Sequence, residues 1–163
     1  CLLIIDIQED NKKIYNYRIF KRNILKLINF ARKNNVFICY IFFIKNEYSY
    51  WSNFKKELVG NFQEEGEPLE FILPKKNENI IYKSGYDSFL NTNLNDVLKK
   101  NNIKTLYVSG VLTGVCVLNT IFSAFNLGYR VIVIKNCCSD KNKKRHLDVF
   151  DNYSNYLFIT ENI

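Results

Sequence analysis

Apolar residues along the chain fall into two patterns: short continuous runs, and longer stretches in which they recur every three or four positions. Continuous runs occupy Cys1–Ile5 and Val36–Ile44. Such runs, with no alternation of apolar and polar residues, are typical of strands buried on both faces. Between them, apolar residues recur at helical spacing from about Arg18 to Arg32. This part of the chain therefore predicts a strand, a helix and a second strand.

The same alternation resumes after a long irregular segment, residues 45–79. A connection of this length without strong elements is usual for a lid or a binding loop. Four further strands are predicted at Asn79–Tyr82, Leu106–Ser109, Val131–Ile134 and Tyr156–Thr160. Three further helices are predicted: one that carries Leu94, Val97 and Leu98 after a cap at Thr92 or Asn93, one at Val115–Leu127 between the turn Gly110–Gly114 and the stop at Gly128, and one at Lys143–Asp151.

This alternation of strand and helix predicts an α/β fold, a three-layer α/β/α sandwich around a mostly parallel sheet of about six strands. With 163 residues, no internal repeat and no linker, we expect one domain spanning residues 1–163. No apolar run reaches the length of a membrane-spanning helix, so we expect no membrane partner. The chain contains no Met and begins inside a strand-like run, which suggests a piece of a longer gene product.

The net charge of +7 and the sequence pI of about 9.1 raise the question of a nucleic-acid partner. Asn, Lys and Ile occur 23, 18 and 19 times, a usage typical of AT-rich coding sequences that spreads Lys over the whole chain. Arg, the residue best suited to base and phosphate recognition, occurs only five times. We interpret the one dense basic run, Lys141–Arg145, as a solvated helix start. We therefore expect no nucleic-acid partner.

The chain has an odd number of cysteines, five, and none of them forms a Cys-x-x-Cys pair. This usage indicates free thiols in a reducing cytoplasm. Four of the five are interpreted as small buried packing residues: Cys1, Cys39, Cys137 and Cys138. The single histidine, His146, excludes a metal site built from several histidines, and we interpret it as a structural or surface residue.

Three reactive side chains follow predicted strands, at the sheet edge where ligands bind in folds of this type. Asp6 and Lys83 each end a strand, and Cys116 lies in the first turn of a helix. The N–H groups at a helix start favour a thiolate and can hold an oxyanion. Asp6 could then accept the proton of Cys116 and return it to a leaving amine. Taken singly, the residues also allow a helix cap for Asp6 and a packing role for Cys116.

Three motifs carry a resemblance to the isochorismatase-like cysteine hydrolases, a family that includes nicotinamidases and N-carbamoylsarcosine amidohydrolases. Leu3–Gln8 resembles the family's opening strand motif. Lys83–Phe89, followed by Thr92 and Leu94, is similar to its lysine motif, and Gly110–Val117, followed by Thr120 and Ala124, resembles its nucleophile motif. The motifs stand in the family's order, and the resemblance spans nearly the whole chain.

The resemblance implies a catalytic triad of Asp6, Lys83 and Cys116 and a cis peptide bond between Val111 and Leu112. The N–H groups of Leu112 and Cys116 would bind the substrate oxygen. It further implies an isochorismatase-like, Rossmann-like topology, cleavage of a small amide or related C–N bond through a thioester on cysteine, no metal or organic cofactor, and a homo-oligomer. A small amide-like molecule is the expected substrate.

Departures from the family pattern leave other functions open. The family often has an aromatic residue where Asn11 stands and an Asp or Asn where Gly114 stands. Residues 45–50 contain Glu47 but no His, so we expect no metal and disfavour nicotinamide. The alternatives are a nicotinamidase-type amidase with a degenerate metal site, and a non-catalytic binding or assembly protein on the same fold. A nucleotide-binding domain is disfavoured because no Gly-rich turn follows the first strand.

Four further residues are candidates for the substrate pocket, each with an alternative role. Gln8 either orients the Asp6 carboxylate or lines the pocket, and its alternative role is to cap a helix. Trp51 either covers a planar substrate or, as we favour, lies at a subunit contact. Tyr86 and Phe89 follow Lys83 closely and either line the pocket or pack in the core.

Overall fold

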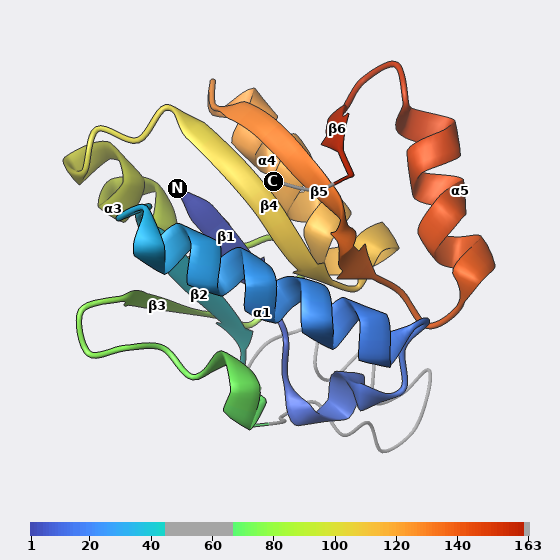
Figure 1. Ribbon diagram of the computed structural model, residues 1–163. Helices are drawn as coiled ribbons and strands as arrows, with labels where there is room; N and C mark the ends of the chain where they lie inside the picture. Colours follow the sequence, from blue (N-terminus) through green and yellow to red (C-terminus); the bar gives the residue numbers. More distant parts are fainter. Residues whose placement is uncertain (45–66, 162–163) are drawn as a thin grey trace.

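The computed structural model describes residues 1–44 and 67–161, and its centre is a parallel β-sheet (Figure 1). The strands are β1 (Leu2–Ile5), β2 (Ile38–Phe43), β3 (Asn79–Lys83), β4 (Thr105–Val111), β5 (Arg130–Ser139) and β6 (Phe158–Thr160). They form a six-stranded sheet in the order β3-β2-β1-β4-β5-β6, and neighbouring strands pair in parallel. The expected parallel sheet of about six strands is confirmed.

Helices cover both faces of this sheet. The α-helices are α1 (Tyr17–Lys33), α3 (Leu94–Lys100), α4 (Leu118–Asn126) and α5 (Lys143–Tyr153), and the shorter helical turns are η1 (Glu9–Lys12), η2 (Glu70–Ile72) and η3 (Thr113–Val117). Apolar residues of α1 pack on one face of the sheet, and those of α3 and α4 pack on the other. The three-layer α/β/α sandwich is therefore confirmed (Figure 1).

The central strand β1 shows why its sequence is continuously apolar. Leu2 and Ile4 belong to the core under α1, whereas Leu3 and Ile5 belong to the core under α3 and α4. All four side chains are fully buried. Side chains alternate between the faces of a strand, so a strand covered by helices on both sides is apolar at successive positions.

The strand order brings the three reactive residues to one edge of the sheet. The chain adds β2 and β3 on one side of β1 and then crosses to β4 on the other side. Ligands bind at such a reversal, beyond the carboxyl ends of the strands. Asp6 follows β1, Lys83 is the last residue of β3, and the η3 turn that holds Cys116 follows β4.

Two strands are longer than the sequence predicts. Gly110 and Val111 were expected in a turn but belong to β4, and β5 continues past Ile134 to Ser139. The pairing register of β4 and β5 shifts between Val108 and Gly110, so this part of the sheet is irregular. Gly110 has a φ of 132°, and its backbone lies against that of Ile5. A residue with a side chain could not take this place, and an irregular strand of this type has no simple apolar pattern.

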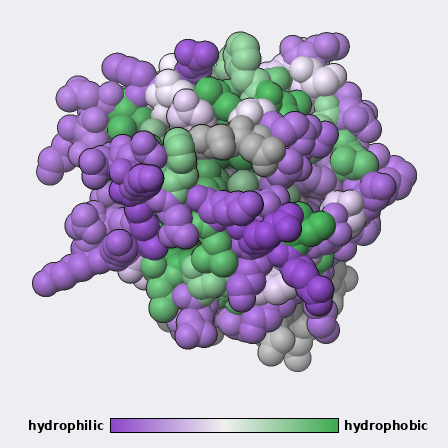
Figure 2. Space-filling view, in the orientation of Figure 1, coloured by the Kyte–Doolittle hydropathy of each residue, from purple (hydrophilic) through white to green (hydrophobic). Residues whose placement is uncertain are grey.

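Polar side chains cover much of the face that Figure 2 shows, with apolar patches between them. The large apolar side chains that are most exposed include Phe125, Tyr156 and Phe158. Such residues are compatible with subunit contacts, and the homo-oligomer stays a prediction. Across residues 1–44 and 67–161, none of the helices has the length and hydropathy to cross a membrane.

The close approach of Gly110 to β1 generates a test of stability. A Cβ atom at Gly110 would lie 2.2 Å from the carbonyl oxygen of Ile5, whereas a Cβ atom at Gly85 would meet nothing within 4 Å. We expect Gly110→Ala to lower the free energy of unfolding by about 3 kcal/mol, because backbone must move to admit the methyl group. Gly85→Ala is the matched control and should change it by less than about 0.5 kcal/mol. Urea denaturation measures both; equal effects of the two substitutions would contradict the close approach.

Candidate active site

A buried ion pair joins Asp6 to Lys83. The ammonium nitrogen of Lys83 lies 2.8 Å from Oδ2 of Asp6, and the exposed fractions of the two side chains are 0% and 6%. The same ammonium donates a hydrogen bond of 2.9 Å to the carbonyl oxygen of Gly85. Two charges this far from solvent need one another, because either alone would lose its hydration without a compensating partner.

Backbone contacts fix Asp6 at the end of β1. Its φ is 52°, a left-handed conformation that Asp adopts more readily than most residues. Its N–H donates to the carbonyl oxygen of Ile41 at 2.9 Å, and its own carbonyl oxygen accepts from the N–H of Gln8 at 3.0 Å. The side-chain amide of Asn11 donates to the same oxygen at 2.8 Å. Asn11, where the family often has an aromatic residue, therefore helps to hold the turn that presents Asp6.

Gln8 connects the end of β1 to the end of β2. Its side-chain amide donates to the carbonyl oxygen of Phe43 at 3.0 Å and accepts from the N–H of Phe43 at 2.9 Å. At the start of η1 its side chain makes no capping hydrogen bond, so the capping role is wrong. The ring of Phe43 lies 5.1 Å from the Lys83 ammonium, a distance typical of a cation–π contact. Sequence reasoning missed Phe43, because it reads as one more apolar residue of a buried strand.

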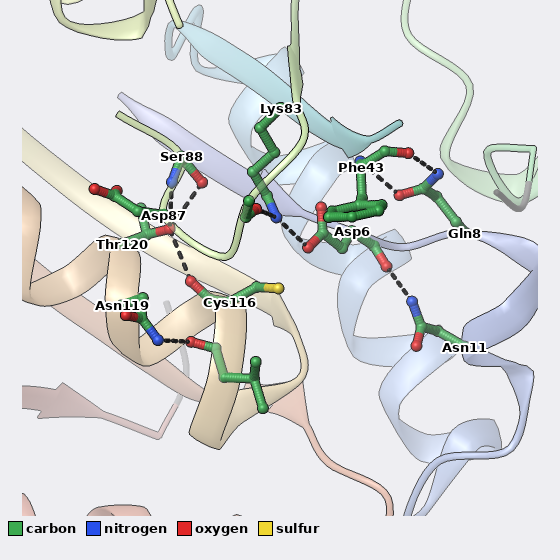
Figure 3. Close-up of polar contacts among 12 residues, drawn as sticks. Asp6, Gln8, Asn11, Phe43, Lys83, Asp87, Ser88, Cys116, Asn119 and Thr120 are labelled. Atoms are coloured by element: carbon green, nitrogen blue, oxygen red, sulfur yellow. Dashed lines mark hydrogen bonds and ion pairs between the residues drawn. The ribbon is translucent and has the colours of Figure 1, made fainter. Parts of the chain in front are cut away.

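The thiol of Cys116 lies beside the ion pair. Cys116 belongs to the η3 turn and is 9% exposed. Its sulfur points toward Asp6 and Lys83, which reach it from β1 and β3 (Figure 3). Both charges act on the thiol: the Asp6 carboxylate raises its pKa, and the Lys83 ammonium lowers it. The three residues that the sequence selected are thus brought together at one edge of the sheet.

Burial and mutual charge set the protonation states of these groups. Burial, and next the charge of Asp6, raise the pKa of Cys116 well above its ordinary value despite Lys83. Burial also raises the pKa of Asp6, against the opposing influence of Lys83 and Cys116. For Lys83, burial acts to lower the pKa, but Asp6 and Cys116 together leave it above its ordinary value. Desolvation thus opposes the thiolate that the helix start is expected to favour, and the pKa of the thiol is raised rather than lowered.

One oxygen of Asp6 is left for a further interaction. Oδ2 accepts from Lys83, and hydrogen bonding with the Cys116 thiol acts to lower the pKa of the carboxyl, but the buried Oδ1 meets no partner with full hydrogen-bond geometry within the part of the chain that the structure describes. Buried carboxylate oxygens are almost always satisfied, so an unsatisfied one calls for a specific explanation. An oxygen in this position, beside a protonated thiol, can accept a proton.

The turn before Cys116 has the expected backbone conformation. The peptide bond between Val111 and Leu112 is cis. The carbonyl oxygen of Leu112 then accepts hydrogen bonds from the N–H groups of Val115 and Val117, at 3.0 and 3.2 Å. These bonds turn the chain directly from β4 into the helical segment that carries Cys116.

The η3 turn is hydrogen-bonded to buried polar residues of α5 and of the segment before α5. Nδ1 of His146 lies 2.8 Å from the hydroxyl of Thr113, and the N–H of Gly114 donates to Oδ2 of Asp140 at 2.8 Å. His146 is 6% exposed, and burial lowers its pKa. It is thus structural, one of the two roles expected for it. Gly114, the second departure from the family pattern, places its N–H against the Asp140 carboxylate.

The remaining pocket candidates divide into two groups. The ring of Phe89 stacks on that of Tyr129 with centroids 6.0 Å apart, and both Phe89 and Tyr86 pack against the core under α3 and α4. Core packing is therefore observed for these two, while a role in a pocket stays a prediction. Trp51 and Glu47 lie outside the described residues. Among residues 1–44 and 67–161, no three His, Cys, Asp or Glu side chains group as metal ligands would.

A comparison with protein families decides the chain's relationship. The family model described as the Isochorismatase domain matches residues 1–160. The chain belongs to the isochorismatase family. The match covers nearly the whole chain and includes all three residues of the candidate site.

Curated isochorismatase relatives match different shares of the chain. Two from Bacillus subtilis (strain 168) are described as uncharacterized isochorismatase family proteins: PncA is 33% identical over 81 residues, and YddQ is 29% identical over 145. The matches cover 48% and 85% of this chain, but 44% and 77% of those proteins. Ureidoacrylate amidohydrolase RutB of Variovorax paradoxus (strain S110) is 29% identical over 86 residues, 50% of this chain and 34% of that protein. The chain thus spans less than half of PncA and of RutB.

Solved structures of isochorismatase-like proteins have the same fold as this chain. An isochorismatase-like hydrolase from Alkaliphilus metalliredigens superposes with a TM-score of 0.83, at 19% identity, over 97% of this chain and 92% of that one. The nicotinamidase SaPncA from Staphylococcus aureus gives 0.74, at 23% identity, over 99% and 97%. At these identities the similarity shows the isochorismatase-like topology.

The ion pair generates a prediction about stability. Lys83→Met removes the cation and leaves the Asp6 carboxylate buried alone, so we expect the free energy of unfolding to fall by about 3 kcal/mol at neutral pH. Lys83 lowers the pKa of Asp6, and its loss raises that pKa further above the value in the unfolded chain. The folded variant then takes up a proton, so its stability should recover as the pH falls toward the ordinary pKa of Asp.

A double substitution provides the control for this prediction. In Asp6→Asn with Lys83→Met no charge is left unpaired, so urea denaturation should give a smaller loss than in Lys83→Met alone. If the single and double variants lose the same free energy, and neither loss depends on pH, the pairing of the two charges does not stabilise the fold.

Proposed function

We propose that the chain is a cysteine hydrolase that cleaves a small amide or a related C–N bond, with Cys116 as nucleophile, Asp6 as proton acceptor and donor, and Lys83 as the stabilising cation. The observation that carries this proposal is the buried Asp6–Lys83 ion pair beside the Cys116 thiol, with Oδ1 of Asp6 left without a full hydrogen bond among the described residues. The family and its relatives named as amidohydrolases support a hydrolase of amide bonds.

The first half of the reaction forms a thioester. The thiol of Cys116 is protonated before substrate binds, because burial and the charge of Asp6 raise its pKa. As the sulfur attacks the substrate carbonyl carbon, its proton passes to Asp6, and the Lys83 ammonium stabilises the charge that develops on sulfur. The carbonyl oxygen becomes an oxyanion, for which the N–H groups of Leu112 and Cys116 are the proposed donors. The C–N bond then breaks, and Asp6 returns the proton to the leaving nitrogen.

The second half releases the acid. A water molecule attacks the thioester carbon and gives a proton to Asp6, which is a carboxylate again after the amine has left. The C–S bond then breaks, the carboxylic acid product leaves, and the proton returns to Cys116. Asp6 thus accepts and donates one proton in each half, and no metal or organic cofactor is needed for either step.

For the substrate we propose a chemical class and not a particular compound. A ureidoacrylate amidohydrolase, a maleamate amidohydrolase and a nicotinamidase among the similar proteins together support a small molecule with a primary amide or a carbamoyl group. Nicotinamide is the alternative substrate. A non-catalytic binding protein is the alternative function, but it would have no need for a buried ion pair beside a thiol, which costs free energy to maintain.

A direct test of this function measures ammonia release from a panel of carbamoyl compounds, small primary amides and nicotinamide. We expect turnover of at least one compound and its loss by a factor of about 1,000 or more in Cys116→Ala and in Asp6→Asn. Cys138→Ala, which removes a buried thiol of the same core, is the control and should keep the activity. Mass spectrometry of the intact protein should detect an acyl group on Cys116 during turnover. Full activity of Cys116→Ala would contradict the proposal.

The pKa shifts predict how the rate depends on pH. Asp6 must be ionised to accept the thiol proton, and burial raises its pKa above 3.8. The rate of acylation should therefore fall as the pH drops through this raised pKa. Lys83 must stay protonated, and since its pKa lies above 10.5, the rate should not fall on its account near neutral pH. A profile of kcat/KM against pH checks both limbs; a rate that is constant down to pH values below the ordinary pKa of Asp would exclude Asp6 as the base.

A further inference from the structure

A chain of buried hydroxyl groups connects the segment after Lys83 to the backbone of Cys116. The hydroxyl of Thr120 donates to the carbonyl oxygen of Cys116 at 2.8 Å. The same hydroxyl oxygen lies 2.7 Å from Oγ of Ser88 and accepts from the N–H of Ser88 at 3.2 Å. Thr120 and Ser88 both have an exposed fraction of 0% (Figure 3).

The positions of the hydroxyl hydrogens of Thr120 and Ser88 follow from counting hydrogen-bond donors. A carbonyl oxygen can only accept, so the single hydroxyl hydrogen of Thr120 is used toward Cys116. The short contact between Thr120 and Ser88 must then be a hydrogen bond that Ser88 donates. The Thr120 oxygen gives one hydrogen and accepts two, which fills its capacity.

The chain of hydroxyls continues from Ser88 to helix α3. The carbonyl oxygen of Ser88 accepts from the hydroxyl of Thr92 at 2.6 Å, and that hydroxyl accepts from the N–H of Leu94, the first residue of α3, at 3.2 Å. The segment after Lys83, residues 84–93, is thus hydrogen-bonded both to the start of α3 and, through Thr120, to the backbone of Cys116. Asp87 adds a second link, because its carboxylate accepts from the hydroxyl of Ser123 on α4 at 2.7 Å.

We infer that Thr120 and Ser88 are positioning residues, which fix the distance between the Cys116 thiol and the Lys83 ammonium through one buried hydroxyl link. The inference rests on the proposed function, since it concerns how that site is held. Lys83 ends β3 and Cys116 follows β4, and two strands lie between β3 and β4 in the sheet. The sheet alone therefore does not join the two segments, whereas the Ser88–Thr120–Cys116 link joins them directly.

The helix offers a matched control for this link. Asn119, the neighbour of Thr120, donates from its side-chain amide to the carbonyl oxygen of Val115 at 2.9 Å. This hydrogen bond also returns four residues along the helix, but it is exposed, and the side chain of Asn119 points away from Ser88 (Figure 3). Loss of the Asn119 bond removes one helix contact next to the nucleophile without touching the segment after Lys83.

The test compares variants that keep or remove the Thr120 hydroxyl. Thr120→Val has nearly the same volume without the hydroxyl, and Thr120→Ser keeps the hydroxyl. Ser88→Ala removes the hydroxyl donor on the other side and keeps the backbone N–H donor. We expect Thr120→Val to lower kcat about 10- to 100-fold with a much smaller change in KM, because misplacement of reacting groups acts on the chemical step. Thr120→Ser should recover most of the rate, and Asn119→Ala should match the wild type.

A second readout does not require a substrate. The rate at which iodoacetamide alkylates Cys116, followed by mass spectrometry of the Cys116 peptide, reports the thiolate fraction at each pH. Because Lys83 lowers the pKa of the thiol, a longer distance from Lys83 should move the alkylation profile of Thr120→Val to higher pH. Ser88→Ala keeps the bond from the N–H of residue 88 to Thr120, so its shift should have the same direction and a smaller size. In a double variant the total shift should be close to that of Thr120→Val alone, since both substitutions act on one link.

The outcomes separate this inference from the proposed function. If the wild type hydrolyses no amide but the alkylation profile moves in Thr120→Val and Ser88→Ala, the link stands and the function fails. If amides are hydrolysed but Thr120→Val and Ser88→Ala keep both the wild-type kcat and the wild-type profile, the inference is overturned. A loss in Thr120→Ser as large as in Thr120→Val would also overturn it, because packing rather than the hydroxyl would be responsible. Should Thr120→Val fail to fold, Ser88→Ala decides by the same criteria.

Discussion

The buried contact between Asp6 and Lys83 is the constraint on which the rest of the site depends. The two residues end strands that are not neighbours, since β2 lies between β1 and β3. Their charges meet across the end of β2, where Phe43 pairs in register with Lys83 and places its ring over the ammonium. Gln8 holds the backbone of Phe43 in turn. Charges so deeply buried must be paired, so the positions of the ends of β1, β2 and β3 depend on one another.

The extent to which the sequence predicts the fold depends on how each strand is surrounded. β1 and β2 are covered on both faces, so their apolar runs reveal them directly. β5 is longer than predicted because Lys135 and Asn136 interrupt its apolar pattern, although the backbone continues in the sheet to Ser139. The register of β4 against β5 shifts beside Gly110, where the backbone packs closely on that of Ile5. Packing of backbone on backbone leaves no periodic pattern of apolar side chains, so the sequence does not reveal it.

The sequence identifies the three reactive residues of the candidate site, but it does not identify the residues that position them. Asp6, Lys83 and Cys116 stand out because they are polar or reactive residues at the ends of apolar runs. Ser88 and Thr120 lie in or directly after motifs that resemble those of the family, but the sequence assigns neither of them a role. Each is a small polar residue whose partners follow only from the packing of the segment after Lys83 against α4. The raised pKa of Cys116 was missed for a related reason, since desolvation depends on neighbours that are distant in sequence.

In the proposed reaction Asp6 accepts the proton of Cys116 and returns it, beside the positive charge of Lys83. The most direct measurement is a titration of the Asp6 carboxyl carbon by NMR in isotopically labelled protein, in the wild type and in Cys116→Ala. The account predicts a pKa above 3.8 that rises further when the thiol is removed, because Cys116 is among the groups that lower it. A pKa of Asp6 at or below the ordinary value, or one that does not respond to the loss of the thiol, would contradict the account.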